Sequence, residues 1–415
     1  MKIVSPQTAV QSITSFNGVF VHSAAAVPRS LIQALSLKHK ELKGVRIYSI
    51  HTEGEAPYAN LDYIDSFILH PFFVGNNIRQ VLEKKMGSYI PTFLSEVPTL
   101  FRTGRIPIDV ALISVSPPDK HGYCSLGPSV DISLAAIQSA KIVIAEINAC
   151  MPRTHGDGFI SLKDIDLAVE NNICLPEVIR PFLSEEEILV GKNIADLIEN
   201  GATLQMGIGA IPNAVMQFLH NHKDIGIHSE MFTDSILPLL EKGVINGAKK
   251  KIHPHTIVGS FALGSEKLYT YIDDNPSVRM LDFSYVNNPR VICRNPKVTS
   301  INSAIEIDLS GQICADSIGA KIYSGVGGQM DFITGASFSD GGKAIIAMTS
   351  TTKKGESKIV PLLKNGAGVV TTRAHVHWIV TEYGAVDLYG KSLEERRRLL
   401  VQIAHPIHRD WLQKN

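Results

Sequence analysis

Short apolar runs of strand length alternate with helix-like segments through most of this 415-residue chain. Aliphatic and β-branched residues dominate these runs, as at 45–50 and 111–116, and the runs end in polar loops. Strands of a parallel sheet have this composition because helices cover both faces of the sheet and bury both sides of each strand. The pattern therefore predicts an α/β fold with mostly parallel sheets.

The length of the chain favours two domains over one. A charged segment, Ser184-Glu185-Glu186-Glu187, lies near the midpoint, and the strand–helix alternation restarts after it. We therefore expect domains at 1–188 and 189–415. The expected strands are 18–23, 45–50, 111–116, 142–146, 203–206, 225–228 and 256–261, and the expected helices are 28–37, 212–220 and 235–242.

The final part of the chain is expected to be richer in strands from about residue 298 onward. Residues 305–308 alternate between apolar and acidic, and 344–348 form an apolar run. Ser392 and Glu395 form a capping-box pattern, which predicts a last amphipathic helix reaching about residue 403.

Charge and cysteine content exclude several classes of protein. The 40 basic and 40 acidic side chains cancel, so no global field attracts nucleic acid or an anionic membrane. The five cysteines are scattered and contain no Cys-x-x-Cys pair, which argues against a disulfide framework and a zinc site. We find no signal-peptide segment and no apolar run of membrane-spanning length. The sequence predicts a cytoplasmic protein that binds neither nucleic acid nor membrane.

A first glycine pair, Gly207 and Gly209 around Ile208, stands where a predicted strand leads into a helix. The glycines allow a sharp turn that exposes amide N–H groups, and Pro212 suits the first position of the helix. Such a turn binds an anion or a developing oxyanion, or it is a plain connection. Pro212 replaces the third glycine of a dinucleotide fingerprint, which argues against a dehydrogenase.

A carboxylate follows a short predicted strand in the segment Gly226-Ile227-His228-Ser229-Glu230. A side chain that leaves the carboxyl end of a parallel strand points into the crevice where α/β proteins bind ligands. A solvated loop glutamate is the common alternative for Glu230. The glycine turn one helix earlier favours a functional role, since a carboxylate beside amide donors suits acyl transfer.

A second glycine-rich segment contains Gly325, Gly327 and Gly328 within four residues. Three glycines this close together indicate a close approach of the backbone to a ligand or to another segment. The segment is interpreted as a phosphate or oxyanion cradle, with a β-bulge as the alternative.

These three segments, in this order, make the chain resemble the acetyl-CoA hydrolase/CoA-transferase family, and its 4-hydroxybutyrate CoA-transferase branch in particular. The resemblance extends over nearly the whole chain, and its most specific parts are the Gly-Ile-His-Ser-Glu and Gly-Val-Gly-Gly-Gln segments. Further matching segments are 113–119 with Gly122, 151–157, 380–384 and 403–406.

The resemblance implies two open α/β domains with the active site at their interface, and a homo-oligomer, expected to be a homodimer. It implies that Glu230 is the nucleophile and that amides around Gly207, Ile208, Gly209, Gly327 and Gly328 form the oxyanion hole. Gln205, Asn287, Gly325 and His155 are the candidate residues for binding CoA or substrate. The family segment usually continues with Asp-Gly, whereas this chain has Asp234-Ser235, a difference that affects the expected loop backbone.

The expected activity is exchange of CoA between a short acyl-CoA and a free carboxylate such as 4-hydroxybutyrate, butyrate, propionate or acetate. This chemistry uses CoA as a substrate and needs no metal or tightly bound cofactor, because one thioester is exchanged for another. Two alternatives stay open. One is an acyl-CoA hydrolase that uses the same Glu230, and the other is a non-catalytic CoA or sugar-phosphate binding protein.

Four other features are given ordinary structural interpretations. The pairs His253/His255 and His375/His377 lack further ligands for a metal site. The run 249–251 of three lysines is expected to be a solvated loop, with contact to the CoA phosphates as the alternative. Cys124 and Cys150 are expected to be small core residues. His155 either selects the acyl group or makes an ordered loop hydrogen bond.

Overall fold

The computed structural model describes residues 1–178, 182–207 and 209–415, and the chain packs into two compact units. Unit 1 comprises Met1–Val178 and Val258–Tyr285, and unit 2 comprises Ile179–Ile257 and Val286–Asn415. The chain returns to unit 1 for residues 258–285, so the division by packing is discontinuous. A single domain boundary after residue 188 stays a prediction.

Unit 1 is built on a seven-stranded sheet in which every pair of neighbouring strands is parallel. In spatial order its strands are β1 (Lys2–Ile3), β10 (Leu167–Glu170), β7 (Ile142–Ile147), β5 (Val110–Val115), β2 (Gly18–Val21), β3 (Val45–Ser49) and β4 (Phe67–Pro71). Its helices are α1 (Pro6–Ala9), α2 (Arg29–Leu37), α3 (Asn76–Glu83), α4 (Val97–Arg102), α5 (Ser133–Ser139) and α9 (Glu266–Ile272). Small additional pairs are β8 (His155–Gly156) with β16 (Val278–Met280) and β6 (Tyr123–Ser125) with β9 (Phe159–Ser161).

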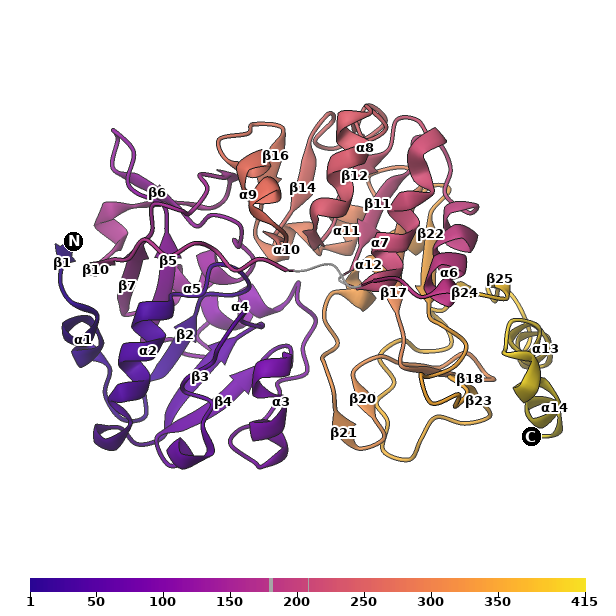
Figure 1. The fold of residues 1–415 in the computed structure, drawn as a ribbon, viewed down its shortest axis with the longest axis horizontal. Coiled ribbons are helices and arrows are strands. Elements are labelled where there is room, and N and C mark those ends of the chain that lie inside the picture. Colours follow the sequence, from indigo (N-terminus) through magenta and orange to yellow (C-terminus); the bar gives the residue numbers. More distant parts are fainter. Residues whose placement is uncertain (179–181, 208) are drawn as a thin grey trace. The chain divides into compact units, whose positions relative to one another are not determined.

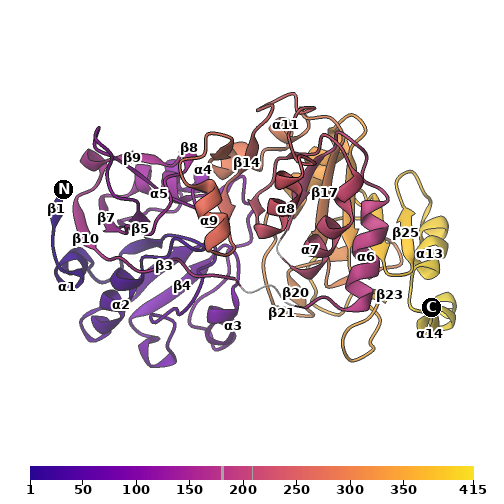
Figure 2. The same cartoon turned by 45° about the horizontal axis from the view of Figure 1, so that its top comes forward.

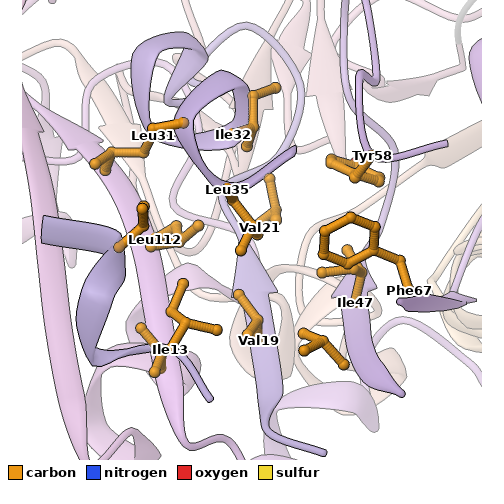
Figure 3. Close-up of a cluster of buried hydrophobic side chains, with 14 of the residues drawn as sticks. Ile13, Val19, Val21, Leu31, Ile32, Leu35, Ile47, Tyr58, Phe67 and Leu112 are labelled. Atoms are coloured by element: carbon orange, nitrogen blue, oxygen red, sulfur yellow. The ribbon is translucent and has the colours of Figure 1, made fainter. Parts of the chain in front are cut away.

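The core of unit 1 forms where α2 packs on the sheet (Figure 3). Leu31, Ile32 and Leu35 of α2 belong to one buried hydrophobic cluster with Val19 and Val21 of β2. The helix presents these residues at i, i+1 and i+4, the spacing of one helical face. Burial of this apolar face is what holds α2 to the sheet.

Unit 2 is built on a six-stranded sheet that is parallel except at its last pair. In spatial order its strands are β12 (Gly226–Ile227), β11 (Thr203–Met206), β17 (Val298–Ser303), β22 (Lys343–Ala347), β24 (Trp378–Thr381) and β25 (Gly384–Asp387). Its helices are α6 (Glu185–Ala195), α7 (Ala210–Gln217), α8 (Leu237–Glu241), α11 (Pro289–Ile292), α12 (Gln329–Phe338), α13 (Leu393–Gln402) and α14 (Pro406–Lys414). Along the chain, α10 (Phe283–Val286) contains the last residues of unit 1 and the first residue of the second segment of unit 2.

Helices α6 and α7 pack side by side, and α12 packs on β17 and β22 (Figure 1). The last two helices, α13 and α14, pack on each other beyond β25 (Figure 2). A smaller sheet joins β18 (Glu306–Asp308) to β19 (Ile313–Cys314) and β23 (Ile359–Val360), and β20 (Ser317–Ile318) pairs with β21 (Lys321–Ile322). The β-rich character expected after residue 298 is confirmed.

The α/β fold with parallel sheets predicted from the sequence is confirmed, and most element boundaries lie within two residues of those expected. The capping box at Ser392 is present, with Glu395 bonded back to the Ser392 N–H. One prediction is wrong, because α7 begins at Ala210 and Pro212 is therefore its third residue. The Ser184–Glu187 segment is also a capping box that opens α6. No described helix is long and apolar enough to cross a membrane.

Shortening one buried side chain of α2 should destabilise unit 1. Leu35→Ala removes a fully buried side chain and should lower the free energy of unfolding by about 2–5 kcal/mol. Leu37→Ala, on the same helix but 64% exposed, is the matched control and should change it by less than about 0.5 kcal/mol. Urea denaturation of both variants measures the difference, and equal losses would contradict the assigned face of α2.

Candidate active site

The carboxylate of Glu230 lies against the amide of Asn287 in unit 2. Asn287 Nδ2 donates a hydrogen bond to Glu230 Oε2 at 2.9 Å. Asn287 is fully buried, whereas Glu230 is only partly buried. An amide fixed in the interior therefore holds one oxygen of a carboxylate that is still partly accessible.

Gly328 makes this arrangement possible because it has no side chain. A Cβ on Gly328 would lie 2.0 Å from Glu230 Oε2 and 2.4 Å from Asn287 Nδ2, which is impossibly close. Gly328 also directly precedes α12, so the carboxylate lies beside the first turn of a ten-residue helix. The positive end of a helix dipole favours negative charge at this position.

Ser229 ties the Glu230 segment to the end of β11. Its Oγ accepts from the N–H of Met206 at 3.1 Å and donates to the carbonyl of Met206 at 3.0 Å. Strand β12 also pairs with β11 in parallel register. Glu230 and Gly207, the residues that follow Ser229 and Met206, are therefore held at the same carboxyl edge of the sheet.

His228 is buried and bonds to the backbone beside Asn287. Its Nε2 lies 2.9 Å from the carbonyl oxygen of Val286, and its ring meets Phe332 edge-on with centroids 6.4 Å apart. Burial, with a smaller contribution from the charge of Lys250, lowers the pKa of His228 to about 3. The ring is therefore neutral at physiological pH.

Lys250 is buried although it belongs to a run of three lysines. Its Nζ donates to the carbonyl of Ile227 at 2.8 Å and to that of Thr256 at 2.6 Å. A Cβ on Gly226 would lie 2.6 Å from Lys250 Cγ, so this glycine leaves room for the lysine chain. Burial lowers the pKa of Lys250 to about 7, and the neutral amine still has two N–H bonds for the two carbonyls.

The serine at position 235 does not disturb the loop after Glu230. Asp234–Ile236 forms a 3₁₀ turn that begins with a bond from the Ser235 N–H to Thr233 Oγ1 at 3.3 Å. The two hydroxyls of Thr233 and Ser235 are also 2.8 Å apart. The polar side chain stabilises the turn, so this loop does not need the glycine that the family pattern usually has.

The other predicted site residues have positions in the structure that do not test their predicted roles. Gly209 is the N-cap of α7 with a φ of 133°, Gly207 follows β11, and Ile208 lies outside the described residues. Gln205 pairs its amide with that of Asn302, whose Nδ2 donates to Gln205 Oε1 at 3.1 Å. Gly325 and Gly327 are buried in the segment before α12. The functional roles of these residues stay predictions.

His155 belongs to unit 1, not to unit 2 with Glu230. Its Nε2 lies 3.0 Å from Asp274 Oδ1. The residue belongs to β8, in which its backbone pairs with that of Arg279 in β16. An ordered hydrogen bond of this kind was one of the two explanations for His155, and its role in substrate binding stays a prediction.

Two structural interpretations from the sequence are wrong in part. The 249–251 run is not wholly a solvated loop, because Lys250 is buried, and Cys150 is exposed, whereas Cys124 is buried as expected. Among the described residues no group of three or more His, Cys, Asp or Glu side chains could hold a metal ion, and neither histidine pair belongs to such a group.

Sequence reasoning missed the roles of His228 and Lys250. A histidine between Ile227 and Ser229 in a strand-like segment signals burial, because both neighbours are apolar or small. Nothing in a run of three lysines distinguishes the middle one. Only the tertiary structure brings Lys250 to the carbonyl of Ile227.

Comparisons with known proteins cover the whole chain. A family model described as "Acetyl-CoA hydrolase/transferase N-terminal domain" matches residues 1–183, and "Acetyl-CoA hydrolase/transferase C-terminal domain" matches residues 264–415. The succinyl-CoA:acetate/propanoyl-CoA:succinate CoA transferase of Fasciola hepatica is 49% identical over 401 residues, 95% of this chain and 84% of that protein.

The 4-hydroxybutyrate coenzyme A transferase of Clostridium kluyveri is 48% identical over 412 residues, 99% of this chain and 96% of that protein. Among solved structures, RipA from Yersinia pestis superposes with a TM-score of 0.94 at 34% identity, covering 100% of this chain and 96% of that one.

The buried amine of Lys250 should make stability depend on pH. Its pKa is about 7 in the folded protein and near 10.5 when unfolded, so the unfolded chain binds more protons between these values. Stability should therefore rise from pH 7 towards pH 10, by at most about 1.4 kcal/mol per pH unit, and Lys250→Met should lose this contribution. Lys249→Met, at an exposed neighbour, is the control.

Urea denaturation at pH 7, 8 and 9 gives the test. The unfolding free energy of the wild type minus that of Lys250→Met should increase with pH. The corresponding difference for Lys249→Met should stay constant. A constant difference for both variants would show that Lys250 keeps its ordinary pKa.

Proposed function

Because the chain belongs to the acetyl-CoA hydrolase/transferase family, we propose that it exchanges CoA between a short-chain acyl-CoA and a free carboxylate through a thioester on Glu230. The expected family, fold and enzyme class, a CoA-transferase, are confirmed by similarity over the full chain. The observation that supports the role of Glu230 is its contact with Asn287 and Gly328.

The first half-reaction uses Glu230 as a nucleophile. A carboxylate oxygen of Glu230 attacks the acyl-CoA carbonyl, the C–S bond breaks, and an acyl-glutamyl anhydride and CoA thiolate form. The thiolate then attacks the glutamyl carbonyl, the anhydride C–O bond breaks, and the first acid leaves as a carboxylate. Glu230 is now a CoA thioester, and no net proton has moved. Two easier covalent steps replace one difficult transfer.

The second half-reaction reverses these steps with another acid. Its carboxylate attacks the glutamyl thioester and expels CoA thiolate, which then attacks the acyl carbonyl of the new anhydride. The products are a new acyl-CoA and the free Glu230 carboxylate. Because one product leaves before the second substrate reacts, the kinetics should be ping-pong.

Asn287 would act on the oxygen where charge develops. In the resting enzyme its Nδ2 donates to Glu230 Oε2. When Oε1 carries the bond to the acyl carbon, or has left with the first acid and Cδ carries the bond to sulfur, the same N–H polarises the remaining glutamyl carbonyl. Each attack on that carbonyl places negative charge on the oxygen, which the amide and the first turn of α12 stabilise. The Gly327–Gly328 backbone is the proposed second donor.

The substrates are proposed from the relatives. Proteins similar to this chain are named for 4-hydroxybutyrate, acetate, propanoate and succinate, so a short acyl group is the expected substrate class. One methylene changes binding in a pocket by only about 1–3 kcal/mol, so activity towards several of these acids is expected.

A cytoplasmic homo-oligomer is part of the same proposal. A hydrolase using Glu230 is the second candidate, favoured by the description of the family itself.

Trapping the covalent intermediate tests the role of Glu230. Incubation with acetyl-CoA and no acceptor acid, followed by borohydride, should reduce the glutamyl thioester to an alcohol at Glu230 that peptide mass spectrometry detects. Glu230→Gln should abolish both labelling and CoA transfer. Glu241→Gln, at an exposed glutamate of α8, is the control and should retain both.

The outcomes separate the candidate functions. Labelled Glu230 with acyl transfer only when an acid is added supports the transferase. Continuous release of CoA without acid and without labelling would favour direct hydrolysis. Binding of acetyl-CoA with neither labelling nor release would leave a CoA-binding protein.

Asn287 and its neighbour Asn288 provide a second matched pair. Asn287→Ala removes a donor to the reacting oxygen and should lower kcat about 100- to 1,000-fold. Asn288 instead caps α11 by accepting from the Arg290 N–H at 3.0 Å. Asn288→Ala should cost about 1 kcal/mol of stability with little change in kcat. Equal kcat values for the two variants would contradict the role of Asn287.

A further inference from the structure

His228 joins the two segments that present Glu230 and Asn287. It stands two residues before Glu230, and its Nε2 bonds to the carbonyl of Val286, the residue before Asn287. Asn287 in turn donates to Glu230. Two hydrogen bonds therefore connect the same two backbone segments. One joins the His228 side chain to Val286, and the other joins the Asn287 side chain to Glu230.

The tautomer of His228 follows from its surroundings. Val286 offers a carbonyl, which only accepts, so Nε2 must carry the hydrogen. Nδ1 is buried and has no hydrogen-bond partner among the described residues. A second proton at Nδ1 would have no acceptor, in agreement with the lowered pKa of this ring. His228 is therefore a permanently neutral donor and is unsuited to proton transfer near pH 7.

Three further contacts immobilise the backbone around His228. Its own N–H donates to the carbonyl of Leu204 at 3.1 Å. Lys250 holds the carbonyl of Ile227, and Ser229 holds both polar groups of Met206. These contacts fix the backbone of residues 227–229. The bond from His228 Nε2 to the Val286 carbonyl therefore also restrains the position of the segment that carries Asn287.

On the basis of the function proposed above, we propose that His228 is a positioning residue for CoA transfer: its Nε2–H bond to the Val286 carbonyl sets the orientation of Asn287 against Glu230. It touches neither substrate nor the reacting atoms and acts through the Val286–Asn287 backbone. Loss of the bond leaves a buried carbonyl without its donor and allows that backbone to shift. A shift of about 1 Å at a reacting group can cost about 100-fold in rate.

The test combines three variants of His228 with a control. His228→Phe keeps a planar ring and removes the donor. His228→Gln can place an amide N–H near the Nε2 position, whereas His228→Asn reaches only about as far as Nδ1. His222→Phe is the control, because His222 makes the same kind of bond, from Nε2 to the Ile198 carbonyl at 3.1 Å, and also has a buried Nδ1 without a partner.

The measurements are the rate of thioester formation on Glu230 in a single turnover with acetyl-CoA, kcat and KM, the pH profile, and thermal unfolding. His228→Phe should slow thioester formation and kcat about 10- to 100-fold, with KM for acetyl-CoA changed by less than about threefold. His228→Gln should recover most of the rate with an unchanged pH profile, and His228→Asn should not. His222→Phe, at a partly buried histidine, should also lower thermal stability while retaining the wild-type rate.

Three results would overturn the proposal. The first is thioester formation in His228→Phe as fast as in His222→Phe. The second is equal recovery by glutamine and asparagine. The third is a changed pH profile in His228→Gln, which would indicate proton transfer by the histidine itself. Failure of the underlying function is a distinct result, because wild-type Glu230 would then carry no label at all.

Discussion

The hydrogen bond between the Asn287 amide and the Glu230 carboxylate depends on three segments that are far apart in the sequence. Its two partners are 57 residues apart, and the residue that gives them room, Gly328, lies about 40 residues further along. A carboxylate can be held this closely only if the facing backbone has no side chain. A methyl group at Gly328 would overlap both partners, so the geometry of the site requires glycine at this position.

The sheet of unit 2 positions this contact. In a parallel sheet the carboxyl ends of neighbouring strands lie along one edge, so loops that follow different strands converge there. Met206 ends β11, Ile227 ends β12, and the hydroxyl of Ser229 binds the two loops together. The edge strand β12 has only two residues, and the side-chain bonds of His228, Ser229 and Lys250 supplement its few ladder bonds.

These bonds carry a cost in stability. Burying a histidine, a lysine and an asparagine removes polar groups from water, and each burial is unfavourable unless hydrogen bonds replace those to water. The replacement is incomplete, since His228 Nδ1 and Asn287 Oδ1 have no hydrogen-bond partner among the described residues. The apolar residues Ala344–Ala347 of strand β22, which are all buried, contribute to the stabilisation that offsets this cost. Polar groups buried at such a cost are typical of functional sites.

The sequence by itself determined the local elements and the identity of the candidate nucleophile. Strand positions followed from apolar runs and the start of α13 from its capping box, because these signals depend only on neighbouring residues. Glu230 was proposed as the nucleophile from its place after a strand, the glycine turn one helix earlier and the resemblance to the family. The tertiary structure decided which residues meet Glu230. The burial of Lys250, the bond from His228 to Val286 and the return of 258–285 to unit 1 depend on long-range packing. No local pattern records such contacts, because the partners are separated by many residues and come together only when the chain folds.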